Sequence, residues 1–255
     1  MATRYPILLV HGLNWRDDWA ISYWGAMVRT LKGAGYAVFL SGQDALGSVA
    51  GNAEALRRRG EEVLVQTGAE RLNLVAHSKG GIECRLLISG LGFGSRTASL
   101  TTICTPHHGS KSAAYWLTRP RLCRLAGGAM ESFWRARGDL SPDFLAALEA
   151  LTPAAMERFN LENPDDPQVY YQSWQARLLH PGWDPMDRVQ LWLTKTDAPT
   201  DGLVSPESAV WGRDRGILED VSHQDAAGGR RRKHQNFSAV QFYLHLAAEL
   251  AEMGF

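Results

Sequence analysis

Cysteine is scarce in this chain, with only three residues among 255. Cys84, Cys104 and Cys123 are odd in number and irregularly spaced, a pattern that excludes both a disulfide framework and a CxxC metal site. A cysteine outside such patterns packs as a small apolar side chain. We therefore expect all three thiols to lie free in the protein interior.

An excess of charge of either sign is also lacking, because 27 basic residues balance 27 acidic ones. A chain without net charge has no general attraction to polyanions, so we expect no nucleic-acid partner. Apolar residues make up 45% and charged residues 21% of the chain, as in ordinary globular proteins. At this length we expect a single domain that spans residues 1–255.

Long apolar runs are absent as well. The chain begins with one basic residue and an apolar run of only four, at 7–10, whereas a secretory signal needs a longer one. No run approaches the roughly 20 residues of a membrane-spanning helix. We therefore expect a cytoplasmic protein, or a secreted one whose leader is absent from this chain.

The first hundred residues alternate between short β-rich runs and segments with helical periodicity. Strands alternating with helices favour βαβ units around a parallel sheet, and runs this apolar predict a sheet that is covered on both faces. The Gly33-Ala34-Gly35 turn predicts the end of the first helix. The expected strands are 7–10, 37–40, 72–76 and 100–104, and the expected helices are 22–32, 52–66 and 81–89.

The middle of the chain, at about 111–160, has apolar residues at helical spacing and no strand pattern. Ser141 is the expected cap of one helix there, with Pro142 at its first position. Two interpretations remain, a helical lid over a site and an ordinary structural insert. A strand at 189–193 and an amphipathic helix at 238–253 are expected after it.

The segment LNLVAHSKGG at 72–81 carries the strongest chemical pattern. It predicts a strand, a serine in a tight turn and then a helix, which is the context of a nucleophile elbow. Ala76 stands where that motif has its first glycine, and a small side chain is what the tight turn requires. Ser78 is therefore the candidate nucleophile, although a serine can also simply cap a helix.

The segment ILLVHGL at 7–13 runs from a buried strand into His-Gly. An oxyanion hole needs two backbone N–H groups that point at the same atom. We expect one from Lys79, the residue after the nucleophile, and the other from Leu13. His11 is then expected to be structural.

A nucleophilic serine needs a histidine base and a carboxylate that orients it. In this fold the order along the chain is serine, acid, histidine. Of the downstream histidines 180, 223, 234 and 245, His223 lies in a loop-like stretch and is the candidate base. Asp201 follows a strand and a turn and is the candidate acid, with Asp187 and Asp197 as competitors.

Six motifs in the same order make the chain resemble the bacterial true lipases of the Pseudomonas and Burkholderia type. They are RYPILLVHGL at 4–13, NLVAHSKGG at 73–81, TPHHGS at 105–110, VYYQSW at 169–174, DGLVS at 201–205 and HQD at 223–225. The resemblance implies an α/β-hydrolase fold, with a mostly parallel sheet, flanking helices and a helical lid at about 111–160. It also implies that Ser78, Asp201 and His223 form a catalytic triad.

The resemblance further implies a structural calcium ion beside the loop that bears His223. Asp225 matches one ligand, two residues after the histidine. Asp184, in the DPMD stretch at 184–187, matches another, and backbone carbonyls near 229 and 233 would complete the set. Oxygen ligands of this kind suit Ca²⁺.

Together these observations predict a carboxylic-ester hydrolase, a lipase or esterase, that acts on lipophilic esters such as acylglycerols through an acyl-enzyme. The expected partners are a small ester or lipid and a lipid–water interface, with no organic cofactor; the number of subunits is left open. One alternative is an acyltransferase or polyester hydrolase with the same triad. Another is a catalytically silent hydrolase-fold protein that binds lipids.

Overall fold

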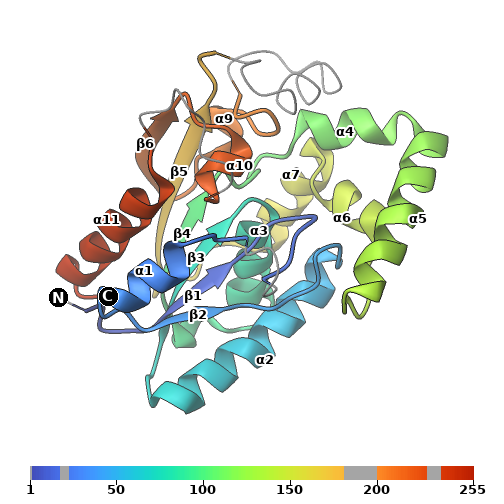
Figure 1. Cartoon of the computed structure of the whole chain (residues 1–255). Helices are drawn as coiled ribbons and strands as arrows, with labels where there is room; N and C mark the ends of the chain where they lie inside the picture. The colour runs from blue at the N-terminus through green and yellow to red at the C-terminus, as the bar shows by residue number, and fades with distance from the viewer. Residues whose placement is uncertain (1, 18–22, 181–199, 229–236) are drawn as a thin grey trace.

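The computed structural model describes residues 2–17, 23–180, 200–228 and 237–255. At its centre lies a six-stranded sheet in the order β2-β1-β3-β4-β5-β6, in which every neighbouring pair is parallel (Figure 1). The expected parallel sheet is therefore confirmed. Its strands are β1 (Ile7–Val10), β2 (Val38–Leu40), β3 (Leu72–His77), β4 (Thr97–Ile103), β5 (Tyr170–Arg177) and β6 (Arg213–Glu219).

The central strands β1, β3 and β4 are buried along their whole length, because helices cover both faces of the sheet. Their continuous apolar or small-residue character made them recognisable in the sequence. The edge strand β6 is mostly exposed and rich in charge, and the sequence pattern did not reveal it. The strand expected at 189–193 lies outside the described residues.

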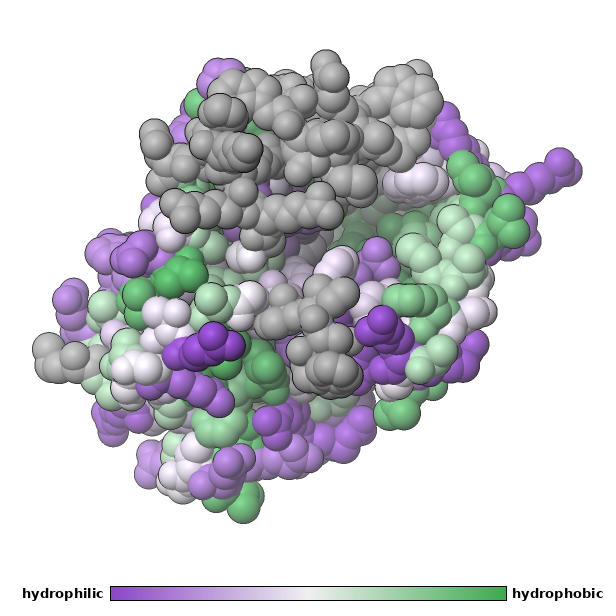
Figure 2. All heavy atoms as spheres, in the orientation of Figure 1, coloured by the Kyte–Doolittle hydropathy of each residue, from purple (hydrophilic) through white to green (hydrophobic). Residues whose placement is uncertain are grey.

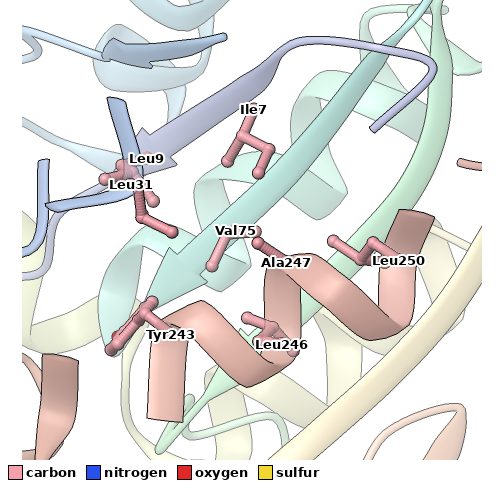
Figure 3. Close-up of a pocket in the computed structure, with 8 residues that line it drawn as sticks. All are labelled: Ile7, Leu9, Leu31, Val75, Tyr243, Leu246, Ala247 and Leu250. Carbon is pink, nitrogen blue, oxygen red and sulfur yellow. The ribbon is translucent and has the colours of Figure 1, made fainter. Parts of the chain in front are cut away.

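Alternate side chains of each strand point to opposite faces, and two apolar clusters result. On one face, α1 (Met27–Gly33) and α11 (Ala239–Glu252) pack against the sheet. On the other, α2 (Val49–Thr67) and α3 (Lys79–Arg85), which continues into the π-helical turn η1 (Leu86–Gly90), do the same. Figure 3 shows the first layer, where side chains of α11 meet those of the sheet and of α1: Ile7, Leu9, Leu31, Val75, Tyr243, Leu246, Ala247 and Leu250.

A helical insert connects β4 to β5, as the absence of a strand pattern predicted. It consists of α4 (Lys111–Leu117), α5 (Pro120–Ala136), α6 (Phe144–Ala150) and α7 (Pro153–Glu162). The cap of α6 is Asp143 rather than the expected Ser141, because the Asp143 carboxylate accepts from the Ala146 N–H at 2.9 Å. In Figure 1 the insert lies to one side of the sheet, above the carboxyl ends of its strands.

Short helical segments complete the fold, namely η2 (Gly94–Arg96), α9 (Pro206–Ala209) and α10 (His223–Ala226). All three cysteines are free and buried, as expected. Among the described residues, no helix has both the length and the apolar character needed to cross a membrane.

Candidate active site

Ser78 stands between the end of β3 and the start of α3, where the chain turns sharply. Its φ of 55° lies in the left-handed region, which is strained for a residue with a side chain. Close packing enforces the turn: a Cβ on Gly80 would lie 2.5 Å from the His11 carbonyl oxygen, and one on Gly81 would lie 2.3 Å from the Thr105 hydroxyl. The elbow geometry expected from the sequence is therefore present.

His223 contacts this serine, although 145 residues separate them in the chain. Its Nε2 lies 2.8 Å from Ser78 Oγ, and its Nδ1 lies 2.7 Å from Asp201 Oδ2. A carboxylate can only accept, so Nδ1 carries the proton and Nε2 is left to accept from the serine hydroxyl. The three residues are 8% (Ser78), 6% (His223) and 1% (Asp201) exposed, so solvent screens these contacts weakly.

The Asp201 carboxylate is held on both of its oxygens. Oδ1 accepts from the backbone N–H groups of Leu203 and Val204, at 2.9 and 2.8 Å, while Oδ2 faces His223. The backbone N–H of His223 also donates to the Asp201 carbonyl at 2.9 Å. These contacts orient the imidazole from the side opposite to Ser78.

The loop after β1 lies directly against the elbow, because β1 and β3 are neighbours and Val10 is in register with Ala76. A Cβ on Gly12 would lie 2.7 Å from the Ser78 Cβ, so only glycine allows this approach. Within the described part of the chain, the Leu13 N–H makes no hydrogen bond. Lys79 is the first residue of α3, where a backbone N–H has no acceptor within the helix.

His11 and Lys79 both direct their side chains away from the serine. The two ring nitrogens of His11 lie 2.9 and 3.2 Å from the carbonyl oxygens of Gly12 and Gln43, which agrees with the structural role expected for it. The Lys79 ammonium is buried and forms an ion pair with Glu83, four residues later in α3. Lys79 therefore presents only its backbone to the site.

Tyr23 and His77 form a second layer that sequence reasoning missed. The Tyr23 hydroxyl shares a hydrogen bond with His77 Nδ1, and it lies so close to Gly12 that a Cβ there would come within 2.8 Å of it. The His77 ring lies 4.6 Å, centroid to centroid, from that of His223. Burial holds the pKa of His77 well below its usual range, and the adjacent His223 adds to the effect. No spacing rule identifies Tyr23, because its role depends on how the turn before α1 packs against the loop after β1 and the end of β3.

One group of potential metal ligands occurs among the described residues, formed by His77, Cys104 and His223. Both nitrogens of His223 already face Ser78 and Asp201, and Tyr23 occupies Nδ1 of His77. Burial, with the nearby Asp201 carboxylate, raises the pKa of the Cys104 thiol well above its usual range. A protonated thiol is a poor ligand, so this group fits a hydrogen-bonded site better than a metal site.

Of the two expected calcium ligands, only Asp225 is described, since Asp184 lies outside the described residues. Asp225 Oδ2 accepts from the backbone N–H and the hydroxyl of Ser222, at 3.1 and 2.6 Å. The Asp225 N–H donates in return to the Ser222 hydroxyl at 3.2 Å, and this reciprocal pair forms a capping box that begins α10 at His223. Asp225 therefore supports the histidine loop directly.

No protein-family model matches the chain, but individual relatives do. Triacylglycerol lipase 2 of Saccharomyces cerevisiae is 30% identical over 259 residues, which cover 92% of this chain and 75% of the yeast protein. A triacylglycerol lipase of Burkholderia plantarii is 34% identical over 177 residues, which cover 64% of this chain and 49% of that protein.

The solved structure of the mature lipase BlEst2 of Bacillus licheniformis resembles this one over 98% of this chain and 93% of that chain, with a TM-score of 0.73 and 18% identity. At that identity the likeness concerns the fold, which is the α/β-hydrolase fold that the sequence motifs implied. The yeast relative covers enough of both chains to establish the family. This chain belongs to the triacylglycerol lipase family.

Proposed function

We propose that this protein hydrolyses carboxylic esters with lipophilic acyl groups, acylglycerols among them, through a covalent acyl-enzyme on Ser78. One observation carries the proposal: a single imidazole lies within hydrogen-bond distance of both the Ser78 hydroxyl and the Asp201 carboxylate. A serine, a histidine and an aspartate in this geometry activate the hydroxyl for attack on a carbonyl.

In the first step Ser78 Oγ attacks the ester carbonyl carbon while His223 Nε2 takes the hydroxyl proton. Asp201 stabilises the imidazolium that forms and keeps Nδ1 protonated. The tetrahedral intermediate then collapses, the ester C–O bond breaks and His223 passes its proton to the departing alcohol. Water, activated by the same histidine, attacks the acyl-enzyme and releases the acid. The reaction needs no organic cofactor.

We assign the oxyanion hole to the backbone N–H groups of Leu13 and Lys79. They belong to the two segments that meet at Ser78, the loop after β1 and the first turn of α3. Donors fixed in this way stabilise the developing negative charge without reorganisation, and one such donor is worth about 3 kcal/mol.

We also propose that the insert at about 111–160 is a lid over this site and that the enzyme works at a lipid–water interface. Leu13 packs in one apolar cluster with Met130 and Trp134. Ile82, in the nucleophile helix, packs in another with Cys123 and Leu148. The insert therefore contacts both segments that would supply oxyanion donors, and its apolar inner face would suit an acyl chain.

A calcium ion held by Asp184 and Asp225 remains part of the proposal. The carboxylate chemistry of these residues fits Ca²⁺, and Asp225 already stabilises the turn that carries His223. Bound calcium would supply structural support to this turn and would take no part in the reaction itself.

The proposal is tested by hydrolysis of p-nitrophenyl esters from acetate to palmitate, together with labelling by a fluorophosphonate. We expect Ser78→Ala to lose turnover by about a millionfold and to escape labelling. Ser95→Ala, at an exposed serine in η2, should behave as the wild type. An inert wild type, or an active Ser78→Ala, would overturn the proposal. Added alcohol reveals acyl transfer if esters of that alcohol accumulate instead of acid.

A further inference from the structure

Helix α5 has a surface that the proposed reaction does not use. Its 17 residues pack on the rest of the protein through one narrow face that includes Cys123, Gly127 and Trp134. A Cβ on Gly127 would lie 2.8 Å from the Phe144 ring, so α5 and α6 are closely packed along this face. The remaining two thirds of the helix circumference face outward.

An apolar stripe occupies part of that outer surface. Leu122, Leu125 and Phe133 are 49%, 75% and 52% exposed, and Ala129 between them is exposed as well. At 100° per residue these four side chains fall within one sector of the helix. Figure 2 shows apolar atoms gathered along the right edge of the molecule, where α5 lies in Figure 1.

A basic strip runs beside the apolar stripe. Arg121, Arg124 and Arg135 lie in the neighbouring sector of α5 and are exposed. Among the described residues, none of the three has a carboxylate partner. Residues 111–137 contain six basic residues and one acidic residue, although the chain as a whole has 27 of each. The acidic residue, Glu131, accepts from the Phe144 N–H at 2.9 Å.

From this geometry we infer that α5 is the docking surface of the protein for anionic phospholipid. A helix with an apolar face beside a basic face lies flat in a lipid surface, with the apolar side chains among the acyl chains and the arginines at the headgroups. A second copy of this chain fits less well, because a symmetric contact would gather the arginines of both copies around one apolar stripe.

This inference extends the proposed function and depends on it, because docking on lipid serves the enzyme only if its site hydrolyses lipid esters. The indole N–H of Trp134, near the end of α5, donates to Asn14 Oδ1 at 2.9 Å. Asn14 directly follows Leu13, the proposed oxyanion donor. Docking through α5 would therefore bring the insert and the oxyanion loop to the surface that holds the lipid esters.

The test is co-sedimentation of the full chain with phosphatidylcholine vesicles, with and without phosphatidylglycerol as the anionic lipid. We expect clear preference for the anionic vesicles. The triple variant Arg121→Gln, Arg124→Gln, Arg135→Gln should bind them about a hundredfold more weakly, at about fivefold per arginine. The matched control replaces three exposed arginines outside the insert, with Arg29→Gln, Arg58→Gln and Arg96→Gln, and should retain binding. Leu125→Asn should weaken binding to both kinds of vesicle.

Equal binding by the two triple variants, or equal affinity of the wild type for both vesicles, would overturn the inference. A different outcome would assign the apolar stripe to a second copy of the chain: the wild type binds no vesicles and is a dimer in sedimentation equilibrium, and Leu125→Asn dissociates this dimer. Turnover of soluble p-nitrophenyl acetate should be unchanged in both triple variants. Because sedimentation requires no hydrolysis, a failure of the proposed ester chemistry would be distinguishable from a failure of docking.

Discussion

Ser78 is held in a left-handed backbone conformation by glycines that other residues could not replace. Gly12 and Gly80 let the loop after β1 approach the elbow backbone to backbone, with no side chain between them. A strained conformation of this kind costs about 1–3 kcal/mol, which the surrounding packing has to offset. The strain keeps the serine hydroxyl above the sheet and facing His223.

At the same scale, Tyr23 links the oxyanion loop to the elbow, and Tyr23→Phe removes only the linking hydroxyl. Because His77 Nδ1 loses its partner, we expect kcat on a soluble ester to fall about tenfold, the effect of one hydrogen bond. KM should change little. Tyr36→Phe, at a buried tyrosine elsewhere in the fold, is the control, and equal kcat values for both variants would contradict the linking role.

At the scale of the element, α3 carries a buried charge pair one turn from the nucleophile. Glu83 accepts from Asn52 and Gln43, at 2.8 and 3.3 Å, in addition to Lys79. A buried ion pair adds little net stability when it is complete, but removal of one partner leaves an uncompensated charge. The pair therefore makes the start of α3 intolerant of single changes.

We expect Lys79→Met to lower the free energy of unfolding by about 3 kcal/mol, because the Glu83 carboxylate would stay buried without its cation. The double variant Lys79→Met, Glu83→Gln should recover most of that loss. Turnover per folded molecule should stay near wild type in both variants, since the site uses only the Lys79 backbone. Urea unfolding and kcat check this, and a large loss of kcat with unchanged stability would mean that the ammonium acts in the reaction.

Helix α10 is only one turn long, yet it positions His223. The support that calcium would give this helix can be tested by removing the metal. If calcium binds at Asp184 and Asp225, a hundredfold excess over its dissociation constant should stabilise the fold by about 2.7 kcal/mol. A chelator should reverse this stabilisation, and Asp184→Asn should abolish it. Asp187→Asn, three residues away, serves as the control. A wild type whose melting temperature ignores both calcium and chelator would exclude the site.

At the scale of the whole molecule, buried neutral histidines make stability depend on pH. Burial lowers the pKa of His77 and of His107 well below the usual range, with Arg85 adding to the effect at His107. The unfolded chain binds protons to these residues below about pH 6.5, whereas the folded chain does not. Protons therefore favour the unfolded state, and stability falls as the pH drops below that value.

We expect His107→Asn to flatten this dependence by up to about 1.4 kcal/mol per pH unit below pH 6.5, the contribution of one proton. His245→Asn, at a histidine that is 74% exposed, should leave the slope unchanged. The raised pKa of the buried Asp17 acts in the opposite sense, so the comparison is made between variants by urea unfolding from pH 5 to 8. Identical slopes for both variants would contradict a neutral buried His107.

The sequence alone determined the structural features that are encoded by contiguous residues. The apolar runs of β1 and β3, the turn at Ser78 and the helix after it are local, so composition and spacing revealed them. Chain order and the strand and turn before it made Asp201 the candidate acid over Asp187 and Asp197, and the motif resemblance strengthened that preference. The exposed strand β6 escaped notice, because an edge strand need not be apolar.

Only the tertiary structure decided which distant groups meet. His223 follows β6, three strands from Ser78 at the end of β3, and its contact with Ser78 depends on how the loops fold back over the sheet. The contact of Tyr23 with His77 and that of Trp134 with Asn14 likewise arise from packing between segments far apart in the chain. Such contacts depend on the position of whole elements, which no local pattern of side chains specifies.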